Sequence, residues 1–93
     1  MARIIARHRV RSFPEWKKAF GEAKSLRTEA GETAVAIYHT VDDPNHVVVV
    51  FDWDSMDRAK EYLTSLDFRM MMRDAGIAEV PDFLYLEAVS EHD

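Results

Sequence analysis

The chain has 93 residues, of which 47% are hydrophobic and 31% charged, and it contains no cysteine. This composition is typical of a globular protein, and it excludes disulfides, iron–sulfur clusters and a thiol nucleophile. The net charge of −5 argues against nucleic acid as the main partner, and no run approaches the roughly 20 apolar residues of a membrane span. We therefore expect one cytoplasmic domain over residues 3–89, with no membrane or nucleic-acid partner, followed by a disordered tail at residues 90–93.

The N-terminal segment predicts a strand followed by a helix. Two sets of side chains alternate over residues 3–11, which is the period-two pattern of a β-strand. Ser12 and Glu15 stand three residues apart, as in the capping box that begins a helix, and Pro14 suits the first turn. Apolar residues then follow at helical spacing as far as Gly31, a favourable C-cap. The apolar stripe of this helix is Phe13, Trp16, Phe20, Ala23, Leu26 and Ala30.

The rest of the chain predicts three more strands and a second helical region. The expected elements are strands at residues 33–40, 46–53 and 82–89 and a helix at residues 56–63. Ser65 is expected to begin a short continuation of the second helical region, which ends at Gly76. The order is βαββαβ, and right-handed crossovers then predict an α+β, ferredoxin-like protomer with an antiparallel sheet and the helices on one face.

Alternation within the strands predicts which side chains face the helices. The more apolar face of each strand is expected there, namely Ile4, Ala6, His8 and Val10; Val47, Val49, Phe51 and Trp53; and Leu84, Leu86 and Ala88. His8 is the one polar side chain in this set. It belongs to a strand that the topology places in the middle of the sheet.

The opposite face of the sheet has no segment left to cover it. Apolar side chains at Val48, Val50, Phe83 and Tyr85 are expected on this face. An uncovered apolar face is typical of an association site, so we predict a homodimer formed through the open sheet face. The charges on that face are expected to pair within or between chains, with Arg7 and Arg9 as donors and Asp52 and Glu87 as acceptors.

The order of elements and two sequence stretches resemble the antibiotic biosynthesis monooxygenase family. One stretch is residues 48–55, Val-Val-Val-Phe-Asp-Trp-Asp-Ser, and the other contains Ala59, Tyr62, Leu63, Ser65 and Phe68. The resemblance covers roughly residues 3–89. It implies a dimeric α/β barrel with a ligand pocket between the helices and the sheet of each protomer. Relatives in that superfamily include cofactor-free monooxygenases of aromatic polyketides, quinol monooxygenases, haem-degrading enzymes, polyketide cyclases and stress-response proteins.

The haem-degrading branch of that family is a poor match. It uses an Asn on the first strand, a Trp on the second helix and a His ten residues further on. The corresponding residues here are His8, Tyr62 and Met72. Because none of the three agrees, we expect neither haem nor another cofactor.

His8 is the leading candidate for catalysis, because a neutral imidazole can accept a proton near neutral pH. Cofactor-free oxygenation needs such a base to form an electron-rich substrate anion. Tyr62 carries a hydroxyl that could orient the substrate. The residues expected to bind an aromatic substrate are Trp16, Phe20, Phe51, Trp53, Phe68 and Met72. The alternative is that these side chains are core residues, with His8 bonded to a backbone carbonyl or a tyrosine hydroxyl.

No metal site is expected. His39 and His46 flank the hairpin near Asp42 and Asp43, but their spacing matches no known metal motif. The sequence thus predicts a cofactor-independent monooxygenase acting on a small aromatic or quinol-type molecule. Two alternatives stay open, a non-oxidative cyclase or isomerase that uses the same residues and a non-catalytic ligand-binding or stress-associated barrel protein.

Overall fold

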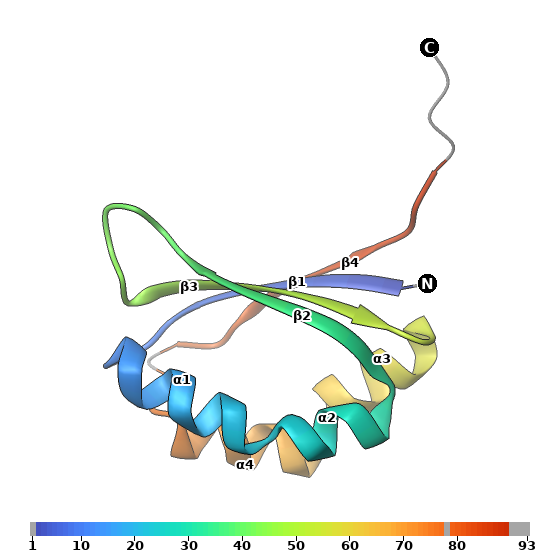
Figure 1. Ribbon diagram of the computed structural model, residues 1–93, viewed down its shortest axis with the longest axis horizontal. Helices are drawn as coiled ribbons and strands as arrows, with labels where there is room; N and C mark the ends of the chain where they lie inside the picture. The colour runs from blue at the N-terminus through green and yellow to red at the C-terminus, as the bar shows by residue number, and fades with distance from the viewer. Residues whose placement is uncertain (1, 78, 90–93) are drawn as a thin grey trace.

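The computed structural model describes residues 2–77 and 79–89 and shows a four-stranded antiparallel sheet with all helices on one face (Figure 1). The elements are β1 (Ala2–Arg9), α1 (Phe13–Glu22), α2 (Lys24–Ala30), β2 (Glu32–His39), β3 (His46–Trp53), α3 (Met56–Leu63), α4 (Leu66–Asp74) and β4 (Asp82–Leu86). The strand order is β2-β3-β1-β4. This is the predicted ferredoxin-like α+β fold, and β1 lies in the interior of the sheet as expected.

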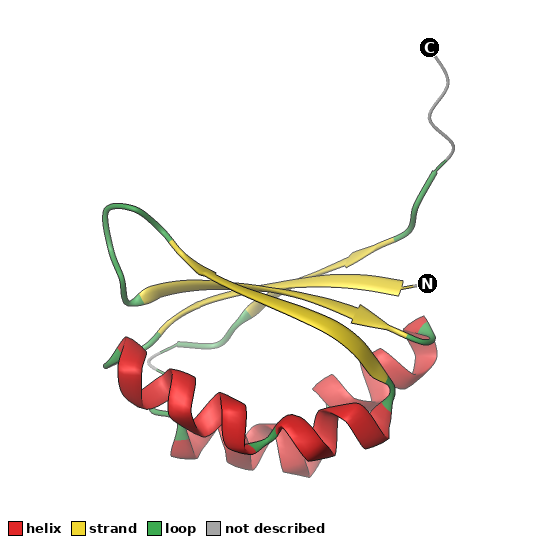
Figure 2. Ribbon diagram, viewed as in Figure 1, coloured by secondary structure: helices red, strands yellow, loops and turns green. Residues whose placement is uncertain are grey.

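The molecule has two layers, and all the described helices lie below the sheet (Figure 2). The core lies between these layers and includes Trp16, Trp53, Phe51, Ile4, Val47 and Val49, all almost fully buried. None of the described helices has the length and apolar character needed to cross a lipid bilayer. The cytoplasmic location stays a prediction, and the expected tail at residues 90–93 lies outside the described residues.

The predicted helix over residues 13–30 is broken into two. The first helix begins as expected, with the Ser12 hydroxyl accepting a hydrogen bond from the Glu15 amide. The chain leaves helical geometry at Ala23 and resumes as α2. The expected stripe is wrong at Leu26, which is 46% exposed, whereas Arg27 is buried. Residues 16, 20, 23, 27 and 30 follow the spacing of four and three, so the inward position belongs to Arg27.

The predicted faces of the last strand are reversed. Phe83 pairs with Ala6 and Tyr85 with Ile4, and paired residues share a face of the sheet. Phe83 therefore packs against the core, while Leu84 lies on the open face opposite Ile5 and is 58% exposed. Both faces of this strand are apolar in sequence, so alternation could not fix its register, and pairing with β1 decides it. The strand also ends at Leu86, so Ala88 lies beyond the sheet.

The arginines of β1 form ion pairs within the protomer, with other partners than predicted. Arg3 pairs with Asp52 at 2.7 Å, because the register of β1 and β3 sets these residues opposite each other. Arg7 pairs with Asp82 at 3.1 Å, again across paired strands. The expected pairing of Arg7 and Arg9 with Asp52 and Glu87 is not observed within the protomer, where Arg9 pairs with Asp43 instead. Pairing of these charges between two chains stays a prediction.

Candidate functional site

His8 lies on β1 opposite Val47 of β3 and points into the helix-facing layer. Its side chain is 5% exposed. The indole of Trp16, one turn into α1, packs beside the imidazole with ring centroids 5.7 Å apart. Phe20 follows one turn later and stacks on Trp16 at 4.9 Å. The capped helix thus covers the histidine with two aromatic rings.

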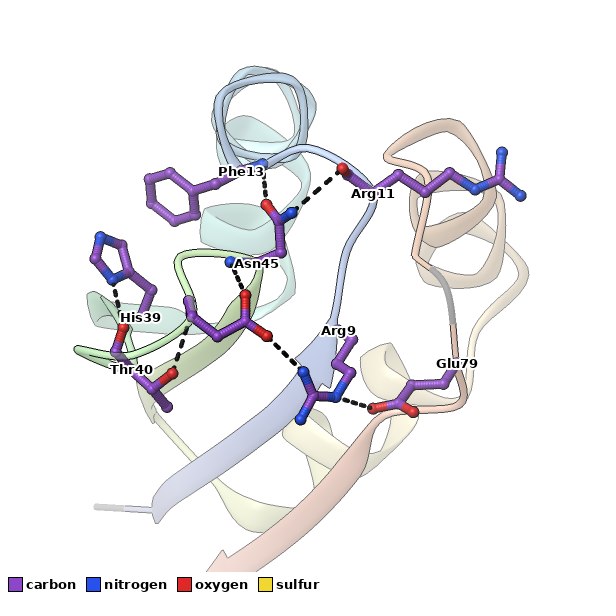
Figure 3. Close-up of polar contacts among 8 residues, drawn as sticks. Arg9, Arg11, Phe13, His39, Thr40, Asn45 and Glu79 are labelled. Carbon is purple, nitrogen blue, oxygen red and sulfur yellow. Dashed lines mark hydrogen bonds and ion pairs between the residues drawn. The ribbon is translucent and has the colours of Figure 1, made fainter.

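Asn45 fixes the start of this helix over the sheet (Figure 3). Its side-chain oxygen accepts a hydrogen bond from the Phe13 amide at 3.0 Å, and its side-chain nitrogen donates to the Arg11 carbonyl at 3.5 Å. Arg9 of β1 forms an ion pair at 2.5 Å with Asp43 of the same hairpin. These contacts join the β2–β3 hairpin to the β1–α1 connection and so hold Trp16 against His8.

A small cavity of about 10 Å³ lies beside His8, with room for about one water molecule. Four of the residues predicted to bind substrate line it, namely Trp16, Phe20, Phe51 and Phe68. The wall residues that sequence reasoning did not assign to the site include Met71, Ile77 and Phe83. Phe83 was missed because of the reversed strand face, and Ile77 because it lies after α4, where it forms an isolated bridge with Val10.

Three buried polar atoms at this cavity have no hydrogen-bond partner among the described residues. They are both ring nitrogens of His8 and the indole nitrogen of Trp16. The expected alternative, a core histidine bonded to a carbonyl or a tyrosine hydroxyl, finds no support in these contacts. Buried polar atoms without partners are costly and rare, so they point to a bound water or ligand.

The imidazole of His8 is neutral in this environment. Burial lowers its pKa to about 4, and the electrostatic effect of nearby His46 acts in the same direction. A neutral ring has one nitrogen that accepts a proton or hydrogen bond and one that donates. It can therefore hold a hydroxyl-bearing ligand and take a proton from it.

The other predicted site residues lie outside this cavity. Tyr62 is buried against Trp53 and Phe68, with ring centroids 5.5 and 5.6 Å away, and lines a separate hollow beside Arg58 and Glu61. Burial raises the pKa of its hydroxyl. Met72 lines a surface hollow on the far side of α4. Among the residues that the structure describes, no group of three or more histidines and carboxylates is placed to hold a metal ion.

Solved structures with the same architecture are known. A candidate antibiotic biosynthesis monooxygenase from Bordetella bronchiseptica is 22% identical, with 96% of this chain and 97% of that chain covered and a TM-score of 0.80. The cofactor-independent oxygenase SnoaB from Streptomyces nogalater is 15% identical, with 97% and 94% covered and a TM-score of 0.77. This chain has the antibiotic biosynthesis monooxygenase fold. The predicted resemblance is thereby confirmed for the fold, while neither the protein-family models nor the curated proteins match the sequence.

This example of the monooxygenase fold also contains a buried ion pair that sequence reasoning missed. The Arg27 guanidinium donates to the Glu32 carboxylate at 2.7 Å and to the Phe20 carbonyl, and it lies 3.7 Å from the centre of the Phe20 ring. Both side chains are nearly inaccessible to solvent. The available signal was the position of Arg27 on the apolar face of its helix, where a charge needs a buried partner.

Proposed function

We propose that this protein is a cofactor-independent oxygenase that acts on a small aromatic or quinol-type molecule bound beside His8. The observation that carries the proposal is a buried, neutral imidazole whose two nitrogens have no partner among the described residues, in a cavity walled by aromatic rings. The similarity in fold to SnoaB, a cofactor-independent oxygenase, supports the same activity.

In the proposed reaction His8 removes a proton from a phenol, hydroquinone or anthrone. Its low pKa keeps the free ring unprotonated, and the negative charge of the new substrate anion stabilises the imidazolium beside it. The electron-rich anion then reduces dioxygen. For an anthrone, two hydrogens leave the methylene carbon, one oxygen atom becomes a carbonyl and the other becomes water, so no external reductant is needed.

Substrate binding requires the cavity to open. A volume of about 10 Å³ accommodates one water and not an aromatic ring, so some of the wall must move. Phe83 and Met71 are partly buried side chains packed against the core, in contrast to the fully enclosed Trp16 and Phe51. We propose that Tyr62 orients the substrate from the far side only in that enlarged state.

Oxygen uptake by chelator-treated protein tests this function. A panel of anthrones, hydroquinones and polyphenols is offered to the wild type, to His8→Leu and to the matched control His39→Leu, which changes an exposed histidine. We expect uptake by the wild type and the control, and a loss of about 10²–10⁴-fold in His8→Leu. Uptake that survives in His8→Leu would contradict the assignment. Turnover without oxygen consumption would instead support the non-oxidative cyclase or isomerase.

We also propose that the protein works as a homodimer joined through the open sheet face. Ile5, Val50 and Leu84 provide apolar surface on that face, and Arg3 and Asp52 pair beside them. Light scattering at low micromolar concentration should give twice the protomer mass for the wild type and for Val41→Glu, which changes a residue that is 98% exposed on the hairpin. Val50→Glu should give the protomer mass, because it buries a charge in the proposed interface. A dimeric Val50→Glu protein would refute this arrangement.

A further inference from the structure

Met71 of α4 lies between two hollows. On one side it lines the small cavity beside His8. On its other side it lines an open groove of about 300 Å³. Among the described residues, only Met71 lines both of them. The side chain of Met71 therefore forms part of the wall between the cavity and this groove.

The groove runs between α4 on one side and α1 and α2 on the other, within the lower layer of the molecule (Figure 1). Its floor is apolar, with Ala19, Leu26 and Met70 among its lining residues. All three ionisable side chains that line it are carboxylates, those of Glu22, Asp67 and Asp74. The exposed Leu26, which the sequence placed in the core, thus contributes to an apolar track beside the cavity.

Three consecutive methionines occupy different positions around this wall. Met70 is 44% exposed and lines only the groove. Met72 lines a third hollow, which shares Ile77 and Pro81 with the His8 cavity. Of these three methionines, only Met71 lines the His8 cavity. An unbranched thioether with three rotatable bonds changes conformation more easily than an aromatic ring or a branched side chain.

We propose that Met71 is the gate to the His8 cavity, through which uncharged or cationic aromatic compounds enter from the groove in preference to anionic ones. The gate would admit a ligand to the buried His8 without separating the helices from the sheet. The carboxylates along the groove lower the local concentration of anions. The aromatic nature of the ligand rests on the proposed function, whereas the route and its charge preference do not.

Thiol labelling tests the route without requiring turnover. The chain has no cysteine, so His8→Cys introduces a single thiol inside the cavity. In this background we would measure the rate at which methyl methanethiosulfonate labels the thiol at pH 8.5. Met71→Ala should raise the rate at least tenfold, because it removes most of the wall. Met71→Leu, which keeps the volume of the side chain, should stay within twofold of the parent.

Neighbouring methionines serve as matched controls. Met70→Ala and Met72→Ala should each label within twofold of the parent, since neither side chain lines the cavity. Leu63→Ala removes a buried side chain of α3 that does not line the cavity, and it controls for labelling through unfolding. If Leu63→Ala or Met72→Ala accelerated labelling as much as Met71→Ala, the gate would be overturned.

The charge preference is tested with two further reagents on the Met71→Ala protein. The cationic aminoethyl methanethiosulfonate should react at least threefold faster than the anionic sulfonatoethyl reagent, after correction for their rates with a free thiol. Replacing all three groove carboxylates by the corresponding amides should remove this ratio, as should 1 M salt. A ratio that persists in the amide variant would overturn the role of the carboxylates. Fast labelling through Met71 in a protein that consumes no oxygen would refute the proposed function alone.

Discussion

Two buried polar groups lie at opposite ends of the same core. His8 stands opposite Val47 at the beginning of β3, and Glu32 stands opposite Trp53 at its end. Glu32 and Arg27 satisfy each other through an ion pair at 2.7 Å, and Arg27 also bonds to a backbone carbonyl. His8 has no hydrogen-bond partner among the described residues.

The two ends of the core differ in how the free-energy cost of burying a polar group is offset. The ion pair neutralises two charges and connects α2 with β2, so its role is structural. The imidazole stays neutral, and its two nitrogens have no partner among the described residues, which costs stability. Burial alone therefore does not distinguish a structural polar group from a candidate functional one in this protein, and the hydrogen-bond partners must be compared as well.

The largest expected effect comes from breaking the ion pair. Arg27→Met leaves the Glu32 carboxylate buried without a partner, and it should lower the free energy of unfolding by about 3–5 kcal/mol. Urea unfolding at pH 7 measures this loss. The double variant Arg27→Met/Glu32→Met should recover most of it, since no charge is then buried. A loss below about 1 kcal/mol in the single variant would show that the pair is not structural.

A smaller effect is expected from the pH dependence of stability. The unfolded chain binds a proton at His8 near the reference pKa of 6.5, whereas the folded protein binds it only near pH 4. The unfolded state thus holds more protons between these two pH values. The contribution of the neutral His8 to the free energy of unfolding is therefore fully present above pH 6.5 and is lost as the pH falls to 4. This loss of stability is about 3 kcal/mol.

Comparison with His8→Leu isolates this contribution, because the carboxylates titrate in both proteins. The wild type should lose about 3 kcal/mol more than the variant when urea unfolding is repeated at pH 4 instead of pH 7. At pH 7 the variant should be at least as stable as the wild type, since it buries no unpaired polar atoms. Parallel pH profiles would mean that the ring is already protonated or solvated in the folded protein.

The smallest effect is expected at Tyr62, whose buried hydroxyl, like the nitrogens of His8, has no hydrogen-bond partner within residues 2–77 and 79–89. Tyr62→Phe removes that hydroxyl and should change the free energy of unfolding by less than about 1 kcal/mol, in the stabilising direction. Thermal unfolding measures the change, and Tyr38→Phe, at an exposed position, is the matched control. A loss of more than 1 kcal/mol relative to that control would assign Tyr62 to the paired, structural group.

The sequence predicted the architecture well, because each element has a strong local signal. The strand at residues 46–53 and the helix at residues 56–63 have the predicted bounds. The capping residues Ser12 and Ser65 begin their helices as expected, with side chains that accept backbone hydrogen bonds, and Ser55 caps α3 in the same way. The candidate site was predictable in part, since a lone histidine on an apolar strand face is visible in the sequence.

Composition, alternation and capping by themselves determined that this chain forms a βαββαβ sheet with His8 inside it, because these signals act between residues close in sequence. Tertiary structure decided which face of β4 packs inward, that Arg27 replaces Leu26 in the core, and that Met71 lines the cavity. These outcomes depend on strand register and on packing between distant segments. The same long-range packing leaves the nitrogens of His8 without partners in the part of the chain that the structure describes, which no local pattern could reveal.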